Sequence, residues 1–175
     1  VKRFMRDEAT LMREAEPSDF ILSRTNAPLA RIALAFLRAG KPARIEGRDI
    51  SKTLLALVRR MKSETIPDMM GKLSRWAERE SDKVRNIRAS EAARQARLDM
   101  IADQVATLDA LSDGLAETAE LEARITELFA EVRSAAIMCS TVHRAKGLEA
   151  ERVFVLTDTL YCNGKRHSEE ESNIH

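Results

Sequence analysis

The chain has 175 residues, of which 44% are hydrophobic, 33% charged and only 4% aromatic, and its formal net charge is +1. No apolar run reaches the roughly 18 residues of a membrane span, and the charged N-terminal region is unlike a signal peptide, so we expect no membrane partner. Two cysteines, Cys139 and Cys162, do not form a disulfide framework, which favours a reducing, cytoplasmic setting. The length suits one domain, or one domain with an insertion.

The near-zero net charge hides an uneven distribution. Residues Arg24–Lys62 contain ten Lys and Arg residues against two acids, whereas Asp109–Arg133 contains seven acids against two arginines. A basic segment in a neutral chain favours a local anionic partner such as a nucleic acid. Solvated helix faces are the other interpretation, and charge alone leaves both open.

A strand, a helix and a second strand are predicted in the first third of the chain. Phe20–Ser23 is a short apolar run typical of a strand. Asn26 can cap the following helix, whose first turn accepts Pro28 because the early amides have no helical partner. One face of this helix carries apolar residues at helical spacing, namely Leu29, Ile32, Ala33, Phe36 and Leu37.

This helix has a clear end, and a strand follows it. Gly40 ends the helix and Pro42 prevents its continuation, so Ala43–Glu46 is predicted as the next strand. The unit is therefore strand–helix–strand and belongs to an α/β sheet. A further amphipathic helix is predicted from about Ser51 to Lys62.

The character of the chain changes at residues 67–134, which we call the insertion. Its apolar residues follow the alternating three-four spacing of a coiled-coil seam: Ala77, Val84, Ile87, Leu98, Ile101, Val105 and Leu108. We predict a long helical hairpin whose first arm, over about 40 residues, would reach on the order of 60 Å. Asp113–Gly114 supplies the turn, and a shorter return helix follows. With its own seam, the segment Asp68–Arg133 is predicted to be removable without unfolding the α/β part.

Strand signals return after the insertion. Ile137–Ser140 and Arg152–Thr157 are predicted strands, and a polar loop connects them. The predicted fold class is thus α/β, a parallel sheet interrupted by a helical hairpin. Residues 1–66 and 135–175 form the two halves of the sheet domain, and 67–134 form the insertion.

A metal site is not predicted. Cys162, His167 and His175 are the remaining candidate ligands, but no C-x-x-C or H-x-x-x-H pairing accompanies them. Solvated or buried side chains are the better interpretation for all three.

Three stretches resemble one protein family. "STVHRAKGLEAERVFVL" resembles the fifth motif of UvrD-like superfamily-one DNA helicases, the Rep/PcrA group, with its T-x-H-x-x-K-G-L-E core intact. "ILSRTNAPLARIALAFLRAGKPARIEG" is similar to a strand–helix–strand of the family's second RecA-like motor domain, and "EEESNIH" to the start of the sixth motif. The matches occur in the family's order and cover roughly residues 18–50 and 136–175.

The resemblance implies an ATP-dependent, 3′-to-5′ DNA helicase or translocase. Its cofactor would be ATP with Mg²⁺, bound mostly by an N-terminal RecA-like domain of the same protein, and its partner would be single-stranded DNA. Walker A, Walker B and the sixth-motif arginine do not occur in the 175 residues, so we expect a piece of a longer enzyme that is inactive alone. The insertion replaces the family's accessory subdomain, whose roles therefore do not carry over.

The family's matching positions imply DNA contacts. They fall on Thr141, His143 and Lys146 in the fifth motif, and on Arg24 and Asn26 after the first predicted strand. The alternatives to DNA contact are a turn or cap for Thr141, an ordinary surface position for His143 and a structural tie for Lys146. Asn26 can cap its helix, contact DNA or do both.

Two further positions are matched to the nucleotide, and no catalytic residue is assigned. Glu149 resembles the family glutamate that accepts a hydrogen bond from the nucleotide ribose, the alternative being an exposed ion pair. Gly147 is placed beside it, and a turn that needs a positive φ is its simplest explanation.

A second hypothesis stays open. The chain would then be a non-catalytic DNA- or protein-binding module, and the insertion a coiled-coil arm that docks a protein partner. A Walker A motif upstream and a T-R-A sequence after His175 in the longer reading frame would distinguish the helicase from this module.

Overall fold

The fold alternates strands and helices around the insertion. The computed structural model describes residues 2–5 (backbone only), 8–130, 135–146 and 150–156. In chain order the elements are β1 (Lys2–Met5), α1 (Glu8–Glu14), β2 (Phe20–Ser23), α2 (Asn26–Arg38), β3 (Ala43–Ile45), α3 (Arg48–Met61), α4 (Ile66–Asn86), α5 (Glu91–Ser112), α6 (Thr118–Leu128), β4 (Ile137–Thr141) and β5 (Val153–Leu156).

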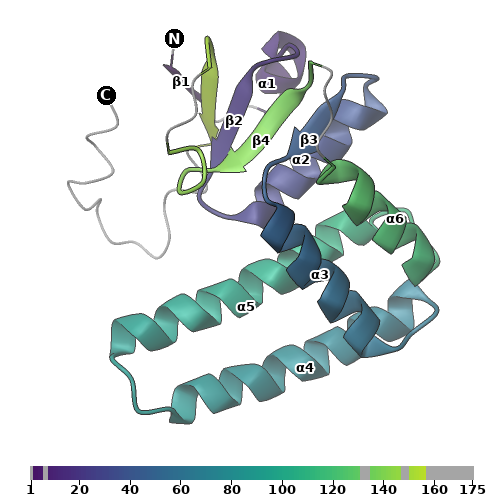
Figure 1. Ribbon diagram of the computed structural model, residues 1–175, viewed down its shortest axis with the longest axis vertical. Helices are drawn as coiled ribbons and strands as arrows, with labels where there is room; N and C mark the ends of the chain where they lie inside the picture. The colour runs from purple at the N-terminus through teal and green to yellow at the C-terminus, as the bar shows by residue number, and fades with distance from the viewer. Residues whose placement is uncertain (1, 6–7, 131–134, 147–149, 157–175) are drawn as a thin grey trace.

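The strands form one parallel sheet in the order β1-β5-β2-β4-β3 (Figure 1). β2 lies between β4 and β5, and Ser23 at its end is in register with Thr141 at the end of β4. The α/β class with a parallel sheet is confirmed, as are the strands predicted near residues 20–23, 43–46, 137–140 and 152–157, to within a residue or two.

The turn after α2 shows why this helix stops where the sequence predicts. Gly40 has φ +74°, and its amide donates to the carbonyl of Leu37, while the amide of Lys41 donates to Phe36. This pair of hydrogen bonds is the Schellman arrangement, which needs a residue with positive φ after the helix. Glycine adopts that conformation without strain, so the chain can turn directly into β3.

β1 and α1 were not predicted from the sequence. β1 pairs with β5 at one edge of the sheet. α1 is short, and its C-terminal carbonyls are satisfied from another element: the Lys41 ammonium donates to the carbonyls of Met12 (2.7 Å) and Ala15 (2.8 Å). Because this stabilisation is tertiary, local periodicity does not indicate it.

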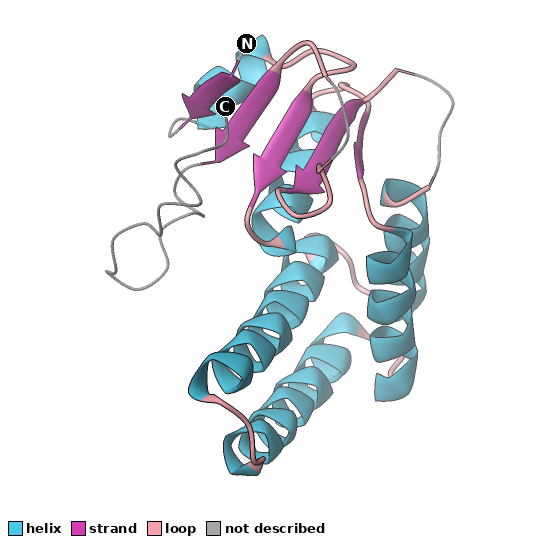
Figure 2. Ribbon diagram, turned by 60° about the vertical axis from the view of Figure 1, so that its left-hand side comes forward, coloured by secondary structure: helices cyan, strands magenta, loops and turns pink. Residues whose placement is uncertain are grey.

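The insertion differs from the predicted hairpin. Its first arm is not continuous over about 40 residues: α4 ends at Asn86, and α5 starts after Ser90, whose hydroxyl accepts a hydrogen bond from the amide of Ala93. The two arms that pack on each other are therefore α4 and α5 (Figures 1 and 2). The turn at Asp113–Gly114 joins α5 to α6 instead. The N-cap at Ser90 breaks the helix that the seam pattern suggested to be continuous.

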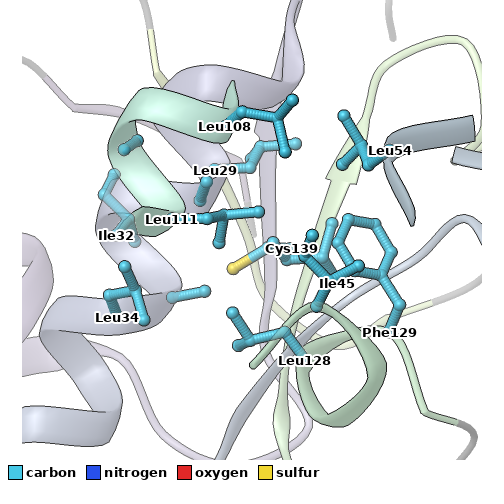
Figure 3. Close-up of a cluster of buried hydrophobic side chains, with 14 of the residues drawn as sticks. Leu29, Ile32, Leu34, Ile45, Leu54, Leu108, Leu111, Leu128, Phe129 and Cys139 are labelled. Carbon is cyan, nitrogen blue, oxygen red and sulfur yellow. The ribbon is translucent and has the colours of Figure 1, made fainter. Parts of the chain in front are cut away.

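The core crosses the border between sheet and insertion. Figure 3 shows Leu108 and Leu111 of α5 facing Leu29 and Ile32 of α2, with Cys139 of β4 beside them. Leu108, Leu111 and Cys139 have no exposed surface, and burial raises the pKa of the Cys139 thiol to about 12. The insertion therefore shares one hydrophobic core with the sheet, which differs from the expectation of a removable hairpin with its own seam.

Among the described residues, no helix combines the length and the apolar character that crossing a membrane requires.

Candidate nucleic-acid interface

Two predicted motifs that are far apart in the sequence meet at the carboxyl edge of the sheet. β2 ends at Ser23 and β4 at Thr141, and these two residues are register partners. Beyond the strands the pairing continues, because the amide of Val142 donates to the carbonyl of Ser23 at 2.9 Å. In Figure 1 the arrowhead of β4 points to the side of the molecule where α5 runs. Residues that follow neighbouring parallel strands gather at such an edge, where ligands of open α/β sheets bind.

The loop after β4 begins as a tight turn. The carbonyl of Thr141 accepts hydrogen bonds from the amides of Arg144 (2.9 Å) and Ala145 (3.0 Å). Thr141 itself is 7% exposed, whereas His143 and Lys146 are exposed. The turn therefore presents a histidine and a lysine to solvent and holds the threonine against the sheet.

An ion pair that the sequence did not indicate anchors this loop. The Arg144 guanidinium reaches Asp49 in the first turn of α3 through two hydrogen bonds, Nη1 to Oδ1 at 2.8 Å and a shorter one from Nη2 to Oδ2. The hydrogen bond from Arg144 holds the pKa of Asp49 below its ordinary value and raises the pKa of Arg144. Two parallel hydrogen bonds fix orientation as well as distance, so this pair sets where the loop lies. Nothing in the local pattern of either segment signals a partner so far along the chain.

The end of β2 carries the other two predicted contacts. Arg24 is exposed, and Asn26 is half-buried as the first residue of α2. Asn26 is not the N-cap: that position is Thr25, whose side chain makes no capping hydrogen bond. The cap comes from Asp103 in α5, whose carboxylate accepts from the amides of Asn26 (3.0 Å) and Ala27 (3.1 Å). A capping residue from another element leaves no local sequence signature.

The remaining candidates lie outside the described residues. These are the nucleotide candidates Gly147 and Glu149, the sixth-motif stretch "EEESNIH", and Cys162, His167 and His175. Within the described part, no group of three or more His, Cys, Asp or Glu side chains is placed to hold a metal ion.

The chemistry available at this edge is hydrogen-bond donation. Arg24, His143 and Lys146 are exposed donors after two adjacent strands. Such a set suits the phosphates of an anionic chain better than proton transfer or nucleophilic attack. No family model, curated protein or solved structure matches the chain in comparison.

Proposed function

We propose that the chain is the second RecA-like motor domain of a UvrD-like, ATP-dependent DNA helicase, and that it supplies contacts to single-stranded DNA and one wall of the ATP cleft. The observation that carries the proposal is the adjacency of β2 and β4, with Ser23 opposite Thr141. This pairing puts Arg24 and the T-x-H-x-x-K stretch, both implied by the resemblance to touch DNA, at the same edge of the sheet.

The proposed contacts are of two physical kinds. Arg24 and Lys146 meet phosphates, and His143 lies on a base or sugar of the strand. Phosphate contacts carry no sequence information, and they weaken as salt rises because binding releases counterions. The chain should therefore bind single strands of different sequence with similar affinity, and more weakly at high salt.

The nucleotide part of the proposal rests on the resemblance. Glu149 would accept from the ribose of ATP beside Gly147, while an N-terminal RecA-like domain of the same protein holds the phosphates and Mg²⁺. Closing and opening of the two motor domains around ATP would alternate their grips on the strand and move the protein 3′ to 5′. In the protein with both motor domains, Glu149→Ala should weaken nucleotide binding and leave DNA affinity nearly unchanged.

Binding of a labelled single-stranded oligonucleotide to the 175-residue chain, followed by fluorescence anisotropy at several salt concentrations, tests the DNA part. His143→Ala should weaken binding by about 1–3 kcal/mol if the ring stacks on a base. Arg24→Ala should weaken binding and lower the slope of log K against log salt by about 0.7, the value for one phosphate of a single strand.

Arg13→Ala is the matched control. Arg13 is also an exposed arginine, but it lies in α1. Its carbonyl accepts from Lys41, which comes just before the start of β3, so Arg13 lies at the amino ends of the strands and the proposed DNA contacts at their carboxyl ends. It should leave affinity and salt slope unchanged. Equal losses in Arg24→Ala and Arg13→Ala, or no binding by the wild-type chain, would contradict the proposal. DNA binding without ATP turnover by the protein with both motor domains would favour the non-catalytic module.

A further inference from the structure

One residue of the insertion reaches the edge described above. The Asp103 carboxylate, in the middle of α5, accepts hydrogen bonds from three N–H groups at the start of α2. They are the backbone amide of Asn26 (3.0 Å to Oδ1 and 3.1 Å to Oδ2), its side-chain Nδ2 (2.7 Å to Oδ2) and the backbone amide of Ala27 (3.1 Å to Oδ1). The first amides of a helix have no partner within the helix, so this acid from a distant segment satisfies them.

The contact also fixes the orientation of the Asn26 side chain. Its Nδ2 donates to Asp103, and its Oδ1 is buried without a hydrogen-bond partner among the described residues. A flipped amide would set Oδ1 against a carboxylate oxygen, and two acceptors repel. Asn26 therefore has its amide donor committed to the insertion, and only one arrangement of its side chain is compatible with Asp103.

The turn held in this way is continuous with the proposed DNA contacts. Thr25, between Arg24 and Asn26, donates its amide to the Ser23 hydroxyl at 3.3 Å. The carbonyl of Ser23 in turn accepts from the amide of Val142, beside His143. These hydrogen bonds and the covalent chain of residues 23–26 thus connect Asp103 with both proposed contact segments.

We infer that Asp103 is a positioning residue through which the insertion holds the proposed DNA-contacting edge. The inference rests on the proposed function. Asp103 does not touch the strand; it fixes the first turn of α2, and with it Arg24 and the end of β2. Docking of the insertion and binding of a strand are then coupled, and each strengthens the other.

Substitutions at Asp103 separate this role from plain electrostatics. Removing a negative charge near a polyanion should raise affinity, whereas loss of positioning should lower it. Asp103→Asn, which keeps the shape but lacks the charge that strengthens the hydrogen bonds from all three N–H groups, should bind a single-stranded oligonucleotide about fivefold more weakly. Asp103→Glu, which keeps the carboxylate, should recover part of the affinity.

Asp109→Asn is the matched control, because it removes the same charge from an exposed position of the same helix. It should bind as tightly as the wild type or slightly more tightly. A role for Asp103 in stability alone would lower the urea midpoint and leave the oligonucleotide affinity of the folded variant unchanged. Affinity of Asp103→Asn equal to or above that of the wild type would therefore overturn the inference, and so would failure of Asp103→Glu to bind better than Asp103→Asn.

Hydrogen exchange of the unmodified chain gives a test that no folding defect can obscure. If the coupling holds, saturating oligonucleotide should slow exchange of the Asn26 and Ala27 amides, because a bound strand favours the docked turn. Unchanged exchange at these amides, in a chain that does bind the oligonucleotide, would overturn the role of Asp103 and leave the proposed function standing. No binding of the oligonucleotide by the wild-type chain would overturn both.

Discussion

Single side chains in this protein satisfy backbone and charged groups of distant segments. Lys41 caps α1, Asp103 caps α2, and the Arg124 guanidinium donates to the carbonyls of Leu111 (2.7 Å) and Asp113 (2.8 Å) at the end of α5. The first two contacts join elements that are far apart in the chain, and the third joins the consecutive helices α5 and α6. Unpaired groups at helix ends are costly when they are shielded from water, so these side chains decide how the helix ends pack.

The ion pair of Arg144 and Asp49 in the loop after β4 should depend on pH. The pKa of Asp49 lies below its ordinary value of 3.8 when folded, chiefly because of the hydrogen bond from Arg144. A lowered pKa in the folded state means that the stabilisation is complete above the ordinary pKa and is lost as pH falls through the folded one. The pair should therefore be fully formed at neutral pH and weaken only in acid, below about pH 4.

We predict that Arg144→Met moves the titration midpoint of the Asp49 carboxyl upward, towards 3.8, in carbonyl-detected NMR. The reason is the loss of the largest contribution that lowers this pKa. Lys52→Met is the control: its charge acts on Asp49 without a hydrogen bond and ranks below Arg144, so a smaller shift is expected. An unchanged midpoint in Arg144→Met would show that the ion pair does not form in solution.

Two glycines of the insertion, one in a turn and one inside a helix, differ in the backbone conformation that their positions require. Gly114, between α5 and α6, has φ +76°, a conformation that residues with a Cβ rarely adopt. Gly71 lies inside α4 with helical geometry, and among the described residues an added Cβ would meet only Arg75 Nη1 at 4.0 Å. The same substitution should therefore have opposite effects at the two positions.

We predict that Gly114→Ala lowers the free energy of unfolding by about 1 kcal/mol and that Gly71→Ala raises it by about 0.5–1 kcal/mol. Both values follow from backbone conformation, because in the part of the chain that the structure describes nothing lies within 4 Å of a Cβ added at Gly114, and a Cβ added at Gly71 has little contact. Urea denaturation followed by circular dichroism measures both. A stabilising Gly114→Ala would mean that the α5–α6 turn does not keep its positive φ in solution.

For the whole molecule, the shared core makes the insertion and the sheet one folding unit. Buried apolar residues of α5 and α6 belong to the same cluster as those of α2 and the strands: Leu108, Leu111, Leu121, Ile125 and Leu128. Removing Leu108 and Leu111 would expose the face of α2 that they cover (Figure 3). Buried leucines carry much of the stability of a small domain, so the sheet should not tolerate their loss.

We therefore predict that deleting residues 68–133 and closing the gap with a flexible linker abolishes cooperative unfolding. The control deletion removes only residues 83–97, the distal ends of α4 and α5, whose side chains are mostly exposed, and it should keep a cooperative transition. Single substitutions test the same core. Leu108→Ala should lower the free energy of unfolding by about 2–5 kcal/mol. Met100→Ala, at a side chain that is 56% exposed, should lower it by about 0.5 kcal/mol or less. A cooperative transition after the long deletion would restore the separable hairpin that the seam pattern predicted.

Sequence alone determined the parts of this protein that local chemistry specifies. Apolar runs marked β2 to β5, and the Gly40 and Pro42 signals marked the end of α2, because hydrophobic periodicity and backbone conformation are properties of short segments. The candidate DNA contacts Arg24 and His143 come from the resemblance of their motifs, and the nucleotide candidates rest on that resemblance alone.

Tertiary structure decided which segments meet. The Ser23–Thr141 register, the ion pair of Arg144 with Asp49 and the cap of α2 by Asp103 all join residues that the chain separates widely. The break at Ser90, by contrast, is a local cap that the seam pattern did not take into account. Packing of α5 on α2 merged the insertion with the sheet core. Such contacts are chosen by the burial of whole faces and by the need to satisfy buried polar groups, and neither is encoded in a local pattern.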